Sequence, residues 1–132
     1  MKTKMLHFKW TVSRGRNSYG YNICTLLVDG VKKGQCNGGG YDMKGTSLAY
    51  WLTNDFQPQL LELFSPEILA KENYSKRFYG VHISEKSKSV YLDGACGFSS
   101  IERIANAIGV KLIWNPESTK RKHDDFYTAI IE

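Results

Sequence analysis

Hydrophobic and polar residues alternate along the first third of the chain, as they do in strands with one buried face. In "LHFKWTV" (residues 6–12), every second residue is apolar, and a period of two predicts a half-buried strand. The segments 19–28 and 31–36 are also rich in strand formers, and the Asp29-Gly30 pair between them is a strong hairpin signal. This part of the chain therefore predicts a three-stranded antiparallel meander.

The period changes to that of a helix in the middle of the chain. Apolar residues with helical spacing are Leu48, Trp51, Leu52 and Phe56. We expect Thr46 or Ser47 to cap the start of this helix, and Pro58 to end or restart it. The run Ser65-Pro66-Glu67 has the composition of a further helix start. The segment 57–77 is therefore expected to be helical.

Strand signals return from Phe78, where "FYGVHIS" and then "SVYLDG" (89–94) suggest two short strands. Ser99 and Glu102 form a capping box, which predicts a helix with Ser99 as its N-cap. The apolar stripe of this helix consists of Ile101, Ile104, Ala105 and Ile108. Gly109 is its expected end. The segments 110–114 and 125–131 then predict two last strands.

These elements predict an α+β fold, an antiparallel sheet with helices packed on one face, in a single domain over residues 1–132. The order of elements also suggests two ββα repeats, with halves 6–56 and 78–131 joined by the helical segment 57–77. The glycine turns "NGGGY" (37–41) and "DGACGF" (93–98) stand at corresponding places. Their likeness has a second explanation, because strand-to-helix turns converge on glycine wherever a positive φ is needed.

The glycines at 38–40 raise the question of a phosphate site. We expect them to be structural, so that each turn seats an aromatic residue, Tyr41 or Phe98, on the helix–sheet seam. Neither the P-loop pattern nor a complete G-x-G-x-x-G is present. Anion binding at the helix start stays open, and no cofactor is expected.

Composition argues against a membrane-spanning or exported protein. The chain has 132 residues, 42% of them hydrophobic, and no apolar run approaches the ~20 residues of a membrane span. We read no signal peptide and expect a location in a cytosol, with the cysteines reduced. Cys24 and Cys36 fall in predicted strands, and we expect them to be buried and inert.

Few residues suggest catalysis or metal binding. His7, His82 and His123 have no ligand spacing, so no metal site is predicted; a polar sheet face shared by His7 and His82 stays open. Cys96 lies just ahead of a predicted helix, a place that lowers a thiol pKa, and His82 lies on the strand pair before it. We expect no enzyme, and a small enzyme using Cys96 and His82 stays an alternative.

The net charge of +5 favours an acidic partner, either a protein surface or nucleic acid. Basic and aromatic residues together suit phosphate contact and base stacking. No known nucleic-acid signature supports that interpretation, and solvated loops would explain the same charges. The candidate binding residues are Arg14, Arg16, Tyr19, Lys32, Lys33, Lys120, Arg121 and Lys122.

The segments "KWTVSRGRNSYGYNICTL…CNGGGYDMKGT" and "LDGACGFSSIERIANAIG" resemble small accessory proteins encoded by tailed phages and prophages. The resemblance spans roughly residues 8–113 and carries over no catalytic residues. It implies a protein that binds and blocks a host machine, as anti-CRISPR and other anti-defence proteins do. The function expected from it is non-enzymatic binding to a host protein complex in the bacterial cytoplasm, and a nucleic-acid-binding accessory protein is the alternative.

Overall fold

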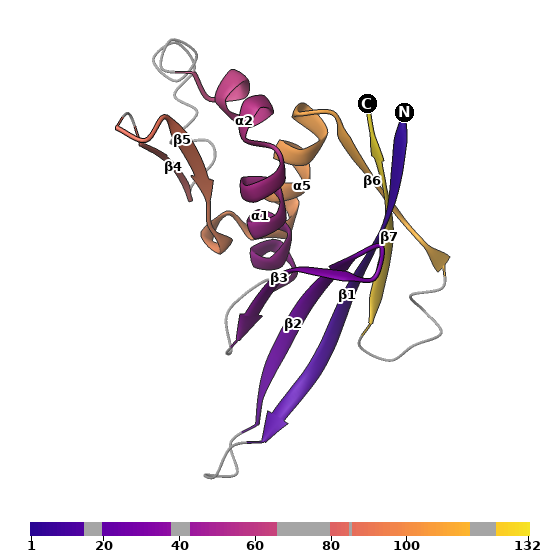
Figure 1. Ribbon diagram of the computed structural model, residues 1–132. Helices are drawn as coiled ribbons and strands as arrows, with labels where there is room; N and C mark the ends of the chain where they lie inside the picture. The colour runs from indigo at the N-terminus through magenta and orange to yellow at the C-terminus, as the bar shows by residue number, and fades with distance from the viewer. Residues whose placement is uncertain (15–19, 38–42, 66–79, 85, 117–123) are drawn as a thin grey trace.

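A computed structural model of the chain has the expected α+β architecture, with an antiparallel sheet and helices packed on one of its faces (Figure 1). The structure describes residues 1–14, 20–37, 43–65, 80–84, 86–116 and 124–132, without the side chains of 12–14, 20–22 and 96.

A five-stranded sheet in the order β3-β2-β1-β7-β6 forms the base of the fold. Its strands are β1 (Lys2–Arg14), β2 (Gly20–Val28), β3 (Val31–Asn37), β6 (Val110–Trp114) and β7 (Asp125–Ile131). All neighbours are antiparallel, and β1, β2 and β3 form the predicted meander. At the β2–β3 turn, Asp29 and Gly30 have φ values of 50° and 84°, the left-handed conformation that favours an Asp-Gly hairpin turn.

The helices follow the apolar patterns of the sequence. They are α1 (Met43–Asp55), α2 (Gln57–Leu63), the short 3₁₀ helix η1 (Gly94–Cys96) and α5 (Gly97–Ala107). The predicted stripe of α1 is buried, including Phe56, and three of the four stripe residues of α5 are fully buried, while Ile108 is half-buried. Pro58 lies in the first turn of α2 and therefore restarts the helix.

Both predicted helix caps are wrong. The first helix already begins at Met43, so Thr46 and Ser47 lie inside it. The Ser47 hydroxyl donates a 3.1 Å hydrogen bond to the carbonyl of Cys24 on β2, which is a tertiary contact. Likewise α5 begins at Gly97, so Ser99 lies in its first turn. The helix signal of Ser65-Pro66-Glu67 falls outside the described residues from 66 onward.

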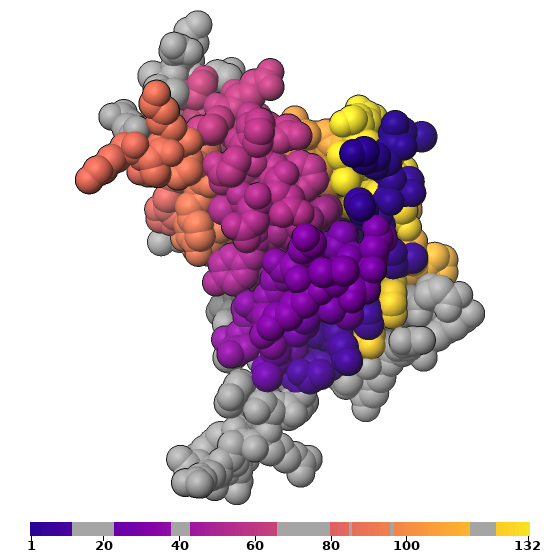
Figure 2. Space-filling model, in the orientation of Figure 1, coloured from indigo at the N-terminus to yellow at the C-terminus, as the bar shows by residue number. Residues whose placement is uncertain are grey.

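A second, two-stranded sheet consists of β4 (Val81–Ser84) and β5 (Ser89–Leu92). In the space-filling view, α1 and α2 lie between this hairpin and the large sheet (Figure 2). The orders β2-β3-α1 and β4-β5-α5 agree with the suggested repeat, although the two hairpins belong to different sheets. The internal repeat therefore stays a prediction.

Glycines allow the first turns of α1 and α5 to approach each other closely. A Cβ atom added to Gly45 would lie 2.7 Å from the backbone nitrogen of Phe98 and 2.9 Å from the carbonyl carbon of Gly97. Such distances do not occur between real Cβ atoms and backbone, so this crossing needs glycine. The contact brings both helix starts to the end of the sheet from which the β1–β2 hairpin extends (Figure 1).

Candidate binding surfaces

The β1–β2 hairpin is longer than the sheet that supports it. On one side, β7 pairs with β1 only as far as Phe8; on the other, β3 pairs with β2 only from Ile23. The β1–β2 ladder continues to the pair of Arg14 and Gly20. Within the described residues, 12–14 and 20–22 therefore form a two-stranded ribbon that projects from the body (Figure 1). We call this segment the β1–β2 arm.

The structure separates the candidate binding residues. Arg14 lies on the arm, whereas Lys32 and Lys33 follow the Asp29–Gly30 turn at the other end of the β2–β3 hairpin. The predicted meander already implied this separation, because Arg14 precedes the strand 19–28 and the two lysines follow the turn at its other end. The remaining candidates lie outside the described residues; they are Arg16, Tyr19, Lys120, Arg121 and Lys122.

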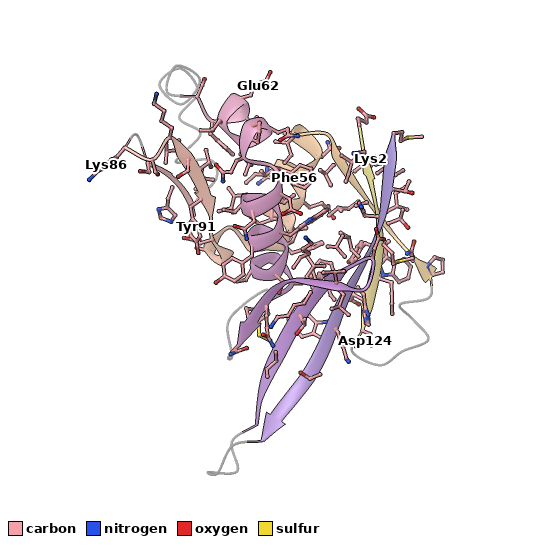
Figure 3. All side chains as sticks on the ribbon, in the orientation of Figure 1. Lys2, Phe56, Glu62, Lys86, Tyr91 and Asp124 are labelled. Atoms are coloured by element: carbon pink, nitrogen blue, oxygen red, sulfur yellow. The ribbon has the colours of Figure 1, made fainter. Side chains whose placement is uncertain are left out.

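Lys33 belongs to a second surface, which we call the lysine groove. This groove has a volume of about 510 Å³ and lies between the sheet and the junction of α1 with α2. Its charged lining consists of Lys2, Lys4, Lys33, Asp29 and Asp55, and its apolar lining of Val28, Val31, Trp51, Phe56 and Ile131. In Figure 3, Lys2 lies on β1 and Phe56 at the helix junction.

Sequence reasoning missed the lysines of this groove that come from β1. The first strand already begins at Lys2, and because side chains alternate along a strand, Lys2 and Lys4 share the face of Leu6 and Phe8. The apolar alternation does not continue into residues 1–5, where lysines take the in-phase positions, so the strand was expected to begin only at residue 6.

Ion pairs compensate most of the positive charge in the lysine groove. The Lys4 ammonium lies 3.4 Å from Asp29 and that of Lys33 lies 3.9 Å from Asp55. A hydrogen bond from the backbone N–H of Met5, followed by the Lys4 ammonium, holds the pKa of Asp29 below its usual value. Lys2 has no ion-pair partner in the described part of the chain. The groove is therefore a weaker site for anions than its lysines suggest.

A third cluster lies where α1 meets the sheet. The Lys44 ammonium lies 4.1 Å from the ring centroid of Phe98, donates a 2.9 Å hydrogen bond to the Tyr127 hydroxyl and pairs with Asp125 at 3.4 Å. Phe98 packs edge-on against Phe8, with ring centroids 6.0 Å apart. The expectation that Phe98 sits on the helix–sheet seam is confirmed. Residues 38–42, with the glycines and Tyr41, lie outside the described residues.

The two described histidines lie in different sheets, which excludes the open possibility that they share one sheet face. On β1, the Nε2 atom of His7 lies 3.1 Å from Asp124, and its ring stacks on Phe126. On β4, in the other sheet, the Nε2 atom of His82 lies 2.6 Å from Asp93. No group of three or more metal-ligand side chains occurs within the described segments.

The cysteines differ in their surroundings. Burial raises the pKa of the Cys24 thiol to about 12, so this residue is buried and unreactive as expected. Cys36, opposite Cys24 in the β2–β3 ladder, is only half-buried, and its thiol donates to the carbonyl of Met43. Cys96 ends η1 directly before α5, but its side chain lies outside the description. Catalysis by Cys96 with His82 stays a prediction.

Comparisons with models of known protein families, with curated proteins and with solved structures find no match. Among the described residues, no helix has both the length and the apolar character needed to cross a membrane.

Proposed function

We propose that this chain is a non-enzymatic binding protein that uses the β1–β2 arm to contact an acidic surface of a macromolecular partner. The observation that carries the proposal is the ladder of β1 and β2, which continues to Arg14 and Gly20 after both flanking strands have ended. A binding role explains an extension that the described sheet and helices do not need for their own packing.

Physical chemistry favours a contact role for the arm. An isolated two-stranded ribbon is marginally stable in water, and its outer edges present backbone groups that can pair with another molecule. Arg14 stands on the arm, and the chain as a whole carries a net charge of +5. A positive protein attracts acidic surfaces over distances of about a Debye length, roughly 8 Å at physiological salt.

The resemblance to phage and prophage accessory proteins supports a target in the host cell. Under this proposal the partner is a host nucleoprotein complex, and binding blocks its action as an anti-defence protein of the anti-CRISPR kind does. An acidic face of such a complex, whether protein or bound nucleic acid, has the charge that the arm requires.

Direct binding to nucleic acid is the second candidate function. A two-stranded β-ribbon fits the major groove of DNA, and the arm has this form. Such binding would weaken steeply as salt rises, because each neutralised phosphate releases counterions. Binding to a protein surface would depend less on salt.

The experiment is affinity purification of the tagged protein from an infected or lysogenic host, with and without DNase and RNase. Arg14→Glu is expected to weaken capture of the partner by about 2 kcal/mol or more, roughly thirtyfold in affinity. Lys86→Glu is the matched control, because it makes the same charge change at an exposed residue of the β4–β5 turn.

Each result bears on the proposal. Capture that survives nuclease treatment and depends on Arg14 supports binding to a host protein, whereas capture lost with nuclease supports the nucleic-acid candidate. If Arg14→Glu and Lys86→Glu bind equally well, the arm is not the contact. Loss of the biological effect in Cys96→Ala, with capture intact, would favour the enzyme alternative.

A further inference from the structure

The edge strand β6 leaves one row of backbone groups unpaired. The N–H of Asn115 donates to Phe126 at 2.9 Å, and the carbonyl of Gly109 accepts from Glu132 at 3.0 Å. These bonds, with the β6–β7 register, direct the backbone groups of odd-numbered β6 residues toward β7. The N–H and C=O groups of Val110, Leu112 and Trp114 therefore point away from the sheet, where no described strand pairs with them.

Two other edges have protection that β6, with the single exposed Lys111, lacks. At the opposite edge of the large sheet, β3 contains a bulge and the exposed pair Lys32 and Lys33, which disfavour strand addition. In the small sheet, the side chains of Gln57 and Thr53 form hydrogen bonds with the backbone groups of β5 that face away from β4.

The strand β6 instead presents apolar side chains beside its open edge. Trp114 is 48% exposed and Ile113 is 41% exposed, on opposite faces of the same strand. An exposed, regular strand with large apolar side chains is a site for pairing with another chain.

A groove runs beside this edge, between β6 and α5. It has a volume of about 310 Å³ and is lined by Glu102, Arg103, Asn106, Lys111 and Leu112. Residues of α5 thus flank the position that an added strand would occupy, and they carry both signs of charge.

We propose that the occupant of this edge is a second copy of the chain, with the two β6 strands paired antiparallel about a two-fold axis at Leu112. The five-stranded sheets of the two copies then form one continuous sheet with the helices on the same face. In this register, the outward backbone groups of Val110 meet those of Trp114 of the second copy, and the two Leu112 residues meet each other.

The side chains of β6 suit self-pairing better than a general peptide. Lys111 stands opposite Ile113 of the second copy, so like charges do not face each other. Trp114 of the second copy lies on the helix side beside Val110, next to the groove that α5 and Leu112 line. The neighbouring charges of Glu102 and Arg103 are complementary across a two-fold axis, where each patch meets its own copy.

The first test is the mass of the protein in solution by sedimentation equilibrium. The wild type is expected to have twice the 15.0 kDa mass of one chain, and Trp114→Lys is expected to sediment as one chain with unchanged circular dichroism. Val31→Lys is the matched control, since Val31 is a 58% exposed apolar residue on the other edge strand; it should remain paired.

The second test is amide hydrogen exchange by NMR, which reports the register without a substitution. Lys111 and Ile113 amides face β7 and are protected at every concentration. Leu112 and Trp114 amides face the second copy, so their exchange should slow roughly fifteenfold when the total chain concentration is about a hundred times the dissociation constant, because roughly 7% of the chains are then unpaired.

Several outcomes would overturn the proposal. A wild type that stays a single chain at all concentrations excludes the second copy, and protection of Leu112 only after a host partner is added assigns the edge to that partner. If the protein is a dimer but the Leu112 and Trp114 amides exchange freely, the two copies pair through another surface. The same holds if Val31→Lys dissociates the dimer.

Discussion

The side-chain amide of Gln57 binds both backbone groups of Val90. Its Nε2 atom donates to the Val90 carbonyl at 2.6 Å, and its Oε1 atom accepts from the Val90 N–H at 3.0 Å. A neighbouring strand would make the same two bonds, so one residue of α2 takes the place of a third strand beside β5. Thr53 of α1 adds a bond from the N–H of Leu92 to its hydroxyl. The helices thereby hold the β4–β5 hairpin on the side remote from the large sheet.

Gln57→Ala is expected to destabilise the protein by about 1–3 kcal/mol, because it leaves two partly buried backbone groups without partners. Chemical denaturation measures the change, and the Val90 amide should exchange faster with solvent. Gln59→Ala is the control, because this neighbour in α2 is exposed. Equal stability of the two variants would show that the double bond to Val90 contributes nothing.

Gly45→Ala is expected to destabilise the fold by about 1–3 kcal/mol, although alanine is the better helix former. The added methyl group would meet the backbone of Gly97 and Phe98 at less than 3.0 Å, so α1 and α5 would have to separate. Asn54→Ala, at an exposed position of the same helix, should be neutral or slightly stabilising. A melting temperature of Gly45→Ala at or above the wild-type value would contradict the close crossing.

Because of the Lys44 cluster, we expect the free energy of unfolding to change with pH in the alkaline range. Burial alone would lower the pKa of Lys44, but the Tyr127 hydroxyl and the Asp125 carboxylate outweigh it and raise the pKa above the usual 10.5. A raised folded-state pKa stabilises the fold fully below the unfolded pKa, and this stabilisation is lost as pH rises through the folded pKa. The stability of the wild type should therefore fall faster above about pH 10.5 than that of Lys44→Met.

At neutral pH, Lys44→Met should be less stable by about 1 kcal/mol, because the variant keeps the stem but loses the cation over Phe98. Lys86→Met, at an exposed turn, controls for the general change in charge. Denaturation curves at several pH values separate the two effects. Parallel pH profiles of wild type and Lys44→Met would rule out this linkage.

The reactivity of the thiols should follow their burial. Cys24 is fully buried with a pKa near 12, so it should resist alkylation in the folded protein at pH 8, while half-buried Cys36 reacts first of the two. Peptide mapping by mass spectrometry after brief treatment with iodoacetamide measures both. In denaturant the two should react alike, and a folded protein in which Cys24 is modified as fast as Cys36 would disprove the assignment.

Much of the fold followed from local patterns. The alternation in β1, the Asp29–Gly30 turn and the apolar stripe of α5 all predicted elements that the structure contains. Helix starts were predicted less well. Serine is a residue type that often caps helices, yet the Ser47 hydroxyl donates to the carbonyl of Cys24 across the helix–sheet interface. The sequence around Ser47 does not show that Cys24 will lie beside it.

The candidate site was only partly predictable. Arg14 was placed on a hairpin, and it lies on one. Nothing in the local sequence showed that flanking strands end at Phe8 and Ile23 and leave the hairpin to continue alone, because that depends on residues far away in β7 and β3. The lysine groove also combines segments from both ends of the chain.

The amino-acid sequence by itself determined which segments are strands and helices and which face of each is apolar, because both follow from spacings of two to four residues along the backbone. Only the tertiary structure decided which strands share a sheet. The β4–β5 hairpin has strand-forming residues like the β1–β2 hairpin, but its free edge binds side chains of the helices. The strand β7, from the end of the chain, lies beside β1, from its beginning. Which strands pair depends on the apolar burial and backbone hydrogen bonding of the whole chain, and a short stretch of sequence does not contain that information.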